Sequence, residues 1–384
     1  SVTFKAAAGE QVLISGGRKL TGFKGDDKGR WTLEIPEVAQ GKWVFNQLFV
    51  NGQRRYRPRA LKDSYFFIGG EVAPSKPDSK GFDRFRFRAG DLKAGWKNLE
   101  HVEVLVFHNW FMSRLPVGSI DEQRNILTLA GTTPNKERWG GLNTNWRYIV
   151  ENVYEALAPG EFYLDRKTGV LTYVPLEGED PAQATVIAPY LETVLSLKGD
   201  VAQKKYVEHL RFEGLSFSHS NWKMGPQGYS FVQAEAVLDG AISAEAAQNC
   251  VFDGCGVKQV GHYGIAFKRG CRNNRVENCE LLDLGAGGVK IGEMSWKGSS
   301  DEEITSHHTI RNNLIAFGGR MHPAAIGVYV AHSPYNVIEH NDIYDFYYTA
   351  VSLGWQWNYT PSNAHHNTVA FNHMHKIGQG VLTD

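Results

Sequence analysis

The sequence predicts an all-β protein: a right-handed parallel β-helix, that is, a solenoid of short strands, with a β-sandwich-like insert near its N-terminus. Three observations carry this prediction. Apolar residues recur in columns along the C-terminal half, a column of Asn accompanies them, and strand-like sequence of a different texture interrupts the solenoid near its start. We assign residues 1–17 to the first solenoid strands, 18–183 to the insert and 184–384 to the solenoid proper.

The repeat appears when lines of sequence are stacked. Neighbouring lines start 24 residues apart between Phe252 and Val276 and 40 residues apart between Phe212 and Phe252, the longer spacing holding extra loop residues. The lines are FEGLSFSHS from Phe212, FDGCGVKQV from Phe252, VENCELLDL from Val276, IRNNLIAFG from Ile310, IEHNDIYDF from Ile338 and VAFNHMHKI from Val369. Their first positions and the positions five residues on are apolar, as a solenoid requires, because each coil buries its inner face only against its neighbours.

The position three residues into each line holds one Leu, then two Cys and three Asn, in the order Leu215, Cys255, Cys279, Asn313, Asn341 and Asn372. We expect the Asn residues to form a stacked amide ladder at a bend of the coil. Cys255 and Cys279 should lie on adjacent coils inside the core as free, buried thiols, because free Cys behaves as a small hydrophobe. The four cysteines lack the paired CxxC spacing of a zinc site, and we expect no metal or other cofactor.

A Gly-containing turn and another short strand follow several of these lines. The strands are YGIAFKR (263–269), GVKIGE (288–293), IGVYVAH (326–332) and AVSLGWQW (350–357). They predict a second parallel sheet, whose outer face is the expected place for a groove. Loops are expected at about 221–240, 294–307 and 358–365, between coils of three strands and three turns.

The insert is indicated by hairpin and alternation signals. Asn51-Gly52 in FVNGQRRY and the stretch LDRKTGVLTYVP (164–175) are typical of β-hairpins. FRFRAG and VEVLVFHNW alternate apolar and polar residues, as strands packed on one face do. Two roles stay open for this insert: a cap on the end of the solenoid, and a wall of a substrate cleft.

Composition excludes some classes of protein. Lys+Arg and Asp+Glu both number 41, so the chain lacks the basic excess of a nucleic-acid binder. It has no apolar run of about 18 residues, so no membrane span is expected. The 10 Trp and 16 Tyr are suited to stacking on sugar rings, although β-core packing accounts for many of them.

The combination LFVNGQRRYRPR, FHNWFMSRLPVGSID, GEFYLDRKTGVLTYVP, LLDLGAGGVKIGE and HNDIYDFYYTAVSLGWQW resembles the right-handed β-helix glycoside hydrolases, nearest to glycoside hydrolase family 141. The resemblance implies a hydrolase of plant or algal polysaccharide, fucosidase- or xylanase-like. It also implies a further coil before Ser1 and a further strand after Asp384, so the groove is expected to be incomplete at the ends.

Glycoside hydrolysis uses two carboxyl groups that flank the scissile bond. The resemblance implies that Asp384, in the LTD motif, is one of them. Asp345 precedes the strand 350–357 on the same rim one coil earlier, so coil geometry permits an Asp345/Asp384 pair. Glu293 ends a strand of the groove sheet and is the third candidate, with a rim ion pair to Lys290 or Lys268 as the alternative. Turn aspartates often only hydrogen-bond the backbone, and we expect Asp283 to fasten its turn.

Other side chains are candidates for binding sugar through ring stacking or hydrogen bonds. They are Trp355, Trp357, Tyr347, His262, His322, His375 and Trp110, with Tyr348, His108 and His373 nearby in sequence. His373 and His375 share a strand face, but a third metal ligand is not evident from the sequence. Asp342 is expected to be solvated in a different part of the coil.

Two other functions stay open. A polysaccharide lyase would want clustered acids for Ca²⁺, or cations for a uronate, and the groove strands offer Lys268, Arg269 and Lys290 but no acidic cluster. A non-catalytic carbohydrate-binding solenoid would keep its glycan affinity without Asp345 and Asp384. For the hydrolase we expect a monomeric protein, secreted or periplasmic, with an oligo- or polysaccharide as its only partner.

Overall fold

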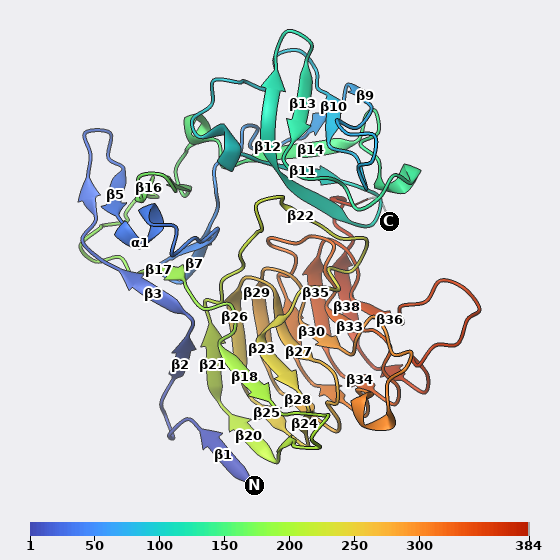
Figure 1. Cartoon of the computed structure of the whole chain (residues 1–384). Helices are drawn as coiled ribbons and strands as arrows, with labels where there is room; N and C mark the ends of the chain where they lie inside the picture. Colours follow the sequence, from blue (N-terminus) through green and yellow to red (C-terminus); the bar gives the residue numbers. More distant parts are fainter. Residues whose placement is uncertain (383–384) are drawn as a thin grey trace.

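The computed structural model describes residues 1–382 and confirms an all-β fold built on a right-handed parallel β-helix (Figure 1). Each coil passes through three parallel sheets. The first sheet consists of β1 (Val2–Lys5), β20 (Leu210–Glu213), β25 (Val251–Asp253), β28 (Arg275–Glu277), β31 (Thr309–Arg311), β34 (Val337–Glu339) and β37 (Thr368–Ala370). The second consists of β2 (Val12–Ser15), β21 (Leu215–Ser218), β26 (Gly256–Val260), β29 (Glu280–Leu284), β32 (Leu314–Ala316), β35 (Asp342–Phe346) and β38 (His373–Ile377).

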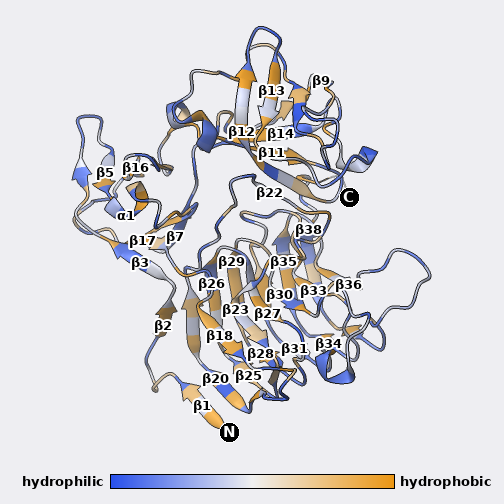
Figure 2. Ribbon diagram, in the orientation of Figure 1, coloured by the Kyte–Doolittle hydropathy of each residue, from blue (hydrophilic) through white to orange (hydrophobic). Residues whose placement is uncertain are grey.

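The third sheet contains the strands that the sequence assigned to the groove. It consists of β18 (Leu195–Lys198), β23 (Gly240–Glu245), β27 (Tyr263–Phe267), β30 (Val289–Ile291), β33 (Val328–Val330) and β36 (Val351–Leu353). A short parallel pair, β19 (Val207–Glu208) and β24 (Ala247–Gln248), lies between the third sheet and the first. Apolar side chains from all three sheets fill the interior, and Figure 2 shows hydrophobic bands on strands such as β18 and β27.

The predicted amide ladder is present. The Asn341 amide Nδ2 donates to Asn372 Oδ1, and Asn313 Nδ2 donates to Asn341 Oδ1, both at 2.9 Å. All four cysteines are buried and free, as expected for Cys255 and Cys279. A second ladder, which the sequence analysis missed, joins Asn336 to Asn367 at the bend before the first sheet.

The insert holds two antiparallel β-bodies, each with its own apolar core. The larger contains β8 (Phe66–Phe67), β9 (Gly70–Glu71), β10 (Arg84–Arg86), β11 (Glu103–Phe107), β12 (Met112–Asp121), β13 (Ile126–Leu129) and β14 (Arg147–Glu151), extended by β22 (Tyr229–Ser230) from a solenoid loop. The smaller contains β3 (Gly17–Leu20), β4 (Lys24–Gly25), β5 (Trp31–Glu34), β6 (Leu48–Val50), β7 (Gln53–Arg55), β15 (Phe162–Leu164), β16 (Val170–Tyr173) and β17 (Val186–Pro189). The strand β17 was expected in the solenoid from residue 184, but it pairs antiparallel with β3 and β6 of the insert.

Both predicted hairpins of the insert are present. Asn51 and Gly52 join β6 to β7 with positive φ values of 51° and 72°, as a two-residue turn of this kind requires. The helical segments are short: α1 (Pro36–Ala39), η1 (Leu99–His101), η2 (Arg138–Gly140), η3 (Tyr154–Ala156) and η4 (Asp301–Glu303). Among the described residues, no helix has the length and apolar character needed to cross a membrane.

Candidate functional site

A row of functional side chains follows the edge at which the strands of the third sheet end. The row is formed by the residue two positions beyond the end of each strand: Arg269 after β27, Glu293 after β30, His332 after β33 and Trp355 after β36. The coils are in register here, since the His332 N–H donates to the Glu293 carbonyl at 3.2 Å. Residues on successive coils are therefore spaced by about 4.8 Å, close enough to contact one ligand together.

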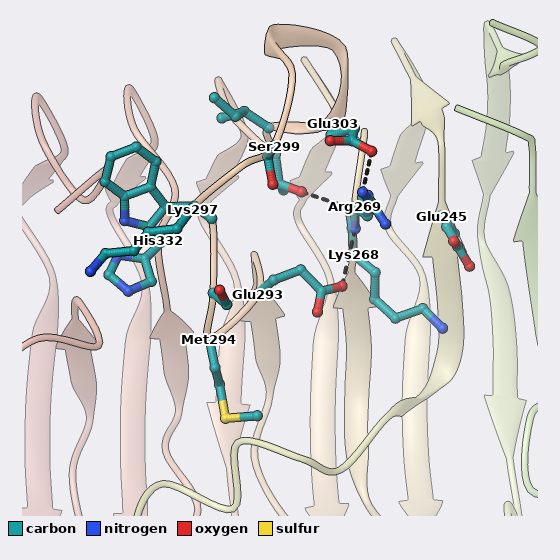
Figure 3. Close-up of a pocket in the computed structure, with 13 residues that line it drawn as sticks. Glu245, Lys268, Arg269, Glu293, Met294, Lys297, Ser299, Glu303 and His332 are labelled. Atoms are coloured by element: carbon teal, nitrogen blue, oxygen red, sulfur yellow. Dashed lines mark hydrogen bonds and ion pairs between the residues drawn. The ribbon is translucent and has the colours of Figure 1, made fainter. Parts of the chain in front are cut away.

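This edge borders a cleft of about 620 Å³ (Figure 3). The loop 294–307 forms its outer wall. A second hollow of about 270 Å³ shares the loop residues 294–297 and His332 with it and extends to Trp355 and Trp357. A third, of about 90 Å³, lies between Trp355 and Gln233. Together they form one elongated cleft, which we call the edge cleft; it is lined by Glu245, Lys268, Arg269, Glu293, Trp296, Lys297, Glu303, His332, Trp355 and Trp357.

The backbone of the preceding coil holds the Glu293 side chain at the edge cleft. Its Oε1 accepts a hydrogen bond from the Arg269 N–H at 3.3 Å. The alternative of an ion pair with Lys268 or Lys290 is wrong: Lys268 pairs with Asp239 at 2.9 Å, and the Lys290 ammonium donates to the carbonyls of Ala236 and Leu238. Burial lowers the pKa of Lys290 to about 8. The Arg269 guanidinium pairs with Glu303 across the cleft wall.

Aromatic rings line the other half of the edge cleft. Trp355 and Trp357 contact each other with ring centroids 4.7 Å apart, and Trp355 stacks on Phe231 at 6.2 Å. Trp357 keeps 66% of its surface exposed. The two tryptophans that the sequence proposed for sugar stacking are thus together in one cleft. Trp110 lies behind this group, where its indole N–H donates to the Val232 carbonyl at 2.8 Å.

The expectation that the outer face of the third sheet is a groove needs correction. The segment 231–239 covers that face: Tyr263 donates to the Ala234 carbonyl, and Gln233 donates to the Tyr348 hydroxyl. The outward-facing Lys290 and Tyr329 are buried as a result. The space open to a ligand follows mainly the edge of the sheet and reaches its outer face beside Tyr329 and Ser352.

Asp345 lies on the opposite edge of the third sheet, at the corner where the second sheet ends. Its Oδ1 forms an ion pair with the Arg320 guanidinium at 2.9 Å and accepts a hydrogen bond from the Gln379 amide at 3.0 Å. Tyr347 accepts a hydrogen bond from Arg320 at 2.9 Å. The proposed partner Asp384 lies outside the described residues. Because Asp345 and Glu293 flank different edges, these two carboxyl groups do not form a catalytic pair.

The corner explains why an aspartate occurs at this position. Each coil from β21 to β38 has a left-handed residue here, with φ between 51° and 62°: His219, Gln259, Asp283, Phe317, Asp345 and Lys376. Asp and Asn are among the non-Gly residues that adopt this conformation most readily. Asp283, expected to fasten its turn, instead pairs with Arg54 of the insert at 2.6 Å.

The predicted histidine ligands are not in the edge cleft. His262 and His322 are buried, and desolvation lowers the pKa of both imidazoles. The His322 ring packs against Trp222 at 4.4 Å. His108 is also buried and stacks on Phe111. His375 lies on the outer face of the second sheet, where it contacts Asp342 at 3.1 Å.

A buried ion network at the junction of insert and solenoid was missed from the sequence. Arg57 binds Glu103 through two hydrogen bonds of 2.6 Å, and Arg114 binds Glu151 at 2.7 Å. Burial opposes ionisation of Glu103, yet Arg57 and Arg114 lower its pKa to about 2. Arg114 also donates to the Met321 carbonyl of the solenoid. The network orients the insert, and Arg59 joins it through Glu151 at 2.9 Å, so that three arginines share two carboxylates.

Sequence reasoning also missed Trp296, Glu303 and His332 in the edge cleft. Extending the column alignment two residues past each strand of the third sheet gives Arg269, Glu293, His332 and Trp355. The repeat in the sequence was therefore sufficient to predict this row, His332 included. Trp296 and Glu303 belong to an irregular loop that the repeat does not define.

Comparisons with known proteins agree with this architecture. A family model described as "Right handed beta helix region" matches residues 242–383. A solved structure titled "Glycoside hydrolase" superposes with a TM-score of 0.80 at 22% identity, covering 100% of this chain and 77% of that one. The complex of XylC with xylose superposes with a TM-score of 0.50 at 11% identity, covering 98% of this chain and 53% of XylC. No curated protein matches the sequence significantly. These likenesses establish the fold and do not single out glycoside hydrolase family 141.

Proposed function

We propose that this chain is a glycoside hydrolase that acts on a plant or algal oligo- or polysaccharide in the edge cleft. The observation that carries the proposal is that the exposed ring of Trp357, supported by the partly buried Trp355, lines the same cleft as the carboxyl group of Glu293. The shared fold with a solved glycoside hydrolase supports it.

Glu293 acts in this proposal as one of the two carboxyl groups. Glu245 lines the same cleft two strands away, and two coil spacings of about 4.8 Å put the two backbones about 10 Å apart. Side chains that lean toward each other then reach the separation of about 6.5–9.5 Å used by inverting glycosidases, with room for a water molecule. One carboxyl protonates the leaving oxygen, and the other activates this water.

The Asp345/Asp384 pair is the competing set of acids. The contacts of Asp345 favour the edge cleft, because Arg320 and Gln379 already bind its Oδ1. Carboxamide variants separate the two sets: Glu293→Gln, Glu245→Gln, Asp345→Asn and Asp384→Asn. Glu280→Gln is the matched control, since Glu280 lies on the second sheet and pairs only with Lys258 among the described residues.

The test is digestion of xylans and fucosylated glycans with products identified by mass spectrometry. XylC is described in complex with xylose, and the resembling family is fucosidase- or xylanase-like, which sets these first substrates. We expect saturated sugars from the parent and the Glu280→Gln control, and a loss of at least 100-fold in Glu293→Gln. Full activity in Glu293→Gln with loss in Asp345→Asn or Asp384→Asn would move the chemistry to the corner.

A polysaccharide lyase is the second candidate, favoured by one observation: Lys268, Arg269 and Lys297 line the edge cleft, and cations suit an acidic glycan. Unsaturated products that absorb in the near ultraviolet would establish it. Glycan binding without any product would instead identify a carbohydrate-binding solenoid. We propose a secreted or periplasmic location, where a large plant or algal glycan would reach the protein.

A further inference from the structure

Three side chains with metal-binding atoms meet on the outer face of the second sheet. Asp342 of β35 and His373 of β38 are directly paired across neighbouring coils, and His375 follows on the same face of β38. Asp342 Oδ1 lies 3.2 Å from His373 Nδ1 and 3.1 Å from His375 Nε2. All three ligand atoms lie within 4.8 Å of one another.

The two separations from Asp342 match those of atoms that share a metal ion. Zn²⁺ binds His nitrogen and carboxylate oxygen at about 2.0–2.2 Å, so two ligands at a tetrahedral or octahedral angle are about 3.0–3.4 Å apart. The two distances from Asp342 Oδ1 fall in this range. The imidazole rings are already aligned, because His373 stacks on His375 at 4.3 Å and His375 stacks on Tyr344 at 4.7 Å.

The negative charge of Asp342 also favours a bound cation. Neighbouring acids on these coils have permanent cations: Glu339 pairs with Arg311, and Asp345 pairs with Arg320. Within residues 1–382, Asp342 has only the two histidines as partners. Its side chain is 44% exposed, and those of His373 and His375 are 73% and 33% exposed, so an ion can enter and keep water in its remaining positions.

We propose that Asp342, His373 and His375 bind a divalent transition-metal ion of the Zn²⁺ class and thereby join β35 to β38. Two imidazoles and one carboxylate suit Zn²⁺, Co²⁺, Ni²⁺ or Cu²⁺, whereas Ca²⁺ and Mg²⁺ prefer oxygen ligands alone. The site is on the second sheet, away from the edge cleft on the third, so the ion stabilises adjacent coils and takes no part in chemistry there. The sequence alone placed His373 and His375 on one strand face, and the fold brings Asp342 from the preceding coil to them as a third ligand.

The experiment is calorimetric titration of the full chain, free of any polyhistidine tag, with ZnCl₂ and separately with CaCl₂. We expect one saturable Zn²⁺ site and no Ca²⁺ site. Asp342→Asn and His375→Ala should weaken Zn²⁺ binding at least 10-fold, with far-ultraviolet circular dichroism confirming that each variant is folded. His365→Ala is the control for non-specific uptake, because His365 lies beside His366 on an exposed part of another turn.

Thermal unfolding gives an independent readout. Saturating Zn²⁺ should raise the Tm of the parent and of His365→Ala by about 2 °C or more, and leave that of His375→Ala unchanged. Absence of saturable binding to the parent would overturn the proposal. Equal Zn²⁺ binding by the parent and by both the Asp342 and His375 variants would overturn it as well.

Discussion

Arg54 of the insert and Asp283 of the solenoid form an ion pair of 2.6 Å at the corner between the second and third sheets. Arg54 is 5% exposed in its side chain, and its guanidinium also donates to the Val260 carbonyl and to Gln47. The pair therefore connects two segments separated by 229 residues in sequence. Its position explains why the smaller body of the insert lies against the start of the solenoid in Figure 1.

Arg54→Ala should lower the free energy of unfolding by about 2–3 kcal/mol. Removal of one partner of a buried ion pair costs about 3–5 kcal/mol, and the 27% exposure of the Asp283 side chain reduces that figure. Urea unfolding followed by tryptophan fluorescence measures the change. Arg311→Ala removes an exposed pair with Glu339 and should cost less than about 1 kcal/mol. Equal losses in the two variants would contradict the role of Arg54.

The Asn ladder should be as important for stability as an apolar core position. Asn313 is buried; its amide donates to the Val276 carbonyl and its Oδ1 accepts from the Cys279 N–H, both at 2.9 Å. Asn313→Ala leaves these buried backbone groups unpaired, so we expect a loss of about 2–4 kcal/mol in urea unfolding. Gln203→Ala, in an exposed turn, should change stability by less than about 0.5 kcal/mol. A neutral Asn313→Ala would show that water replaces the ladder.

Trp357 should contribute to ligand affinity and little to stability. Its side chain is 66% exposed and contacts Trp355 edge-on. Loss of one stacking surface worth about 1–1.5 kcal/mol weakens binding by about 5- to 10-fold. We expect Trp357→Ala to raise KM or Kd for a glycan by that factor with an unchanged Tm. The control is Tyr359→Ala, which removes a fully exposed ring outside the edge cleft and should leave glycan affinity unchanged. An equal loss of affinity in the two variants would show that Trp357 is not part of the binding surface.

The solenoid was predictable because its contacts repeat. Phe212 stacks on Phe252 in the next coil, and Asn313, Asn341 and Asn372 hydrogen-bond in series, so each column in the sequence corresponds to a column in space. The third sheet followed from the same regularity. Each coil packs only on its neighbours, which makes local sequence sufficient for this part of the fold.

The candidate site was less predictable because unique loops build it. The cover over the third sheet depends on single contacts such as Tyr263 to the Ala234 carbonyl, and Trp296 reaches the cleft from an irregular loop. The insert junction depends on Arg114, which reaches the Met321 carbonyl 207 residues away. No periodic pattern encodes these contacts. For the same reason, His262 and His322 have the same sequence character as exposed groove residues, although both are buried and Trp222 and Tyr229 pack on the His322 ring.

Glu235, a buried residue of the cover segment 231–239, should make stability depend on pH. It is buried, and its Oε2 accepts a hydrogen bond from the Tyr229 hydroxyl at 2.5 Å. Desolvation raises the pKa of this carboxyl group from 4.5 to about 7, against the smaller effects of Tyr229 and Arg114. Between pH 4.5 and 7 the unfolded chain releases this proton while the folded chain retains it. Stability from this group therefore falls as pH rises through that window and is constant above it.

Glu235→Gln removes the titration and keeps an oxygen that accepts from Tyr229. A pKa difference of 2.5 corresponds to about 3 kcal/mol, so the stability of the variant relative to the parent should increase by about this amount between pH 4.5 and pH 8. Urea unfolding of both proteins across this range measures the difference in their free energies of unfolding. The contributions of all other titrating groups are common to both proteins and cancel in that difference. Parallel curves for parent and variant would mean that Glu235 ionises in the folded protein as it does in water, and that the cover admits solvent to its carboxyl group.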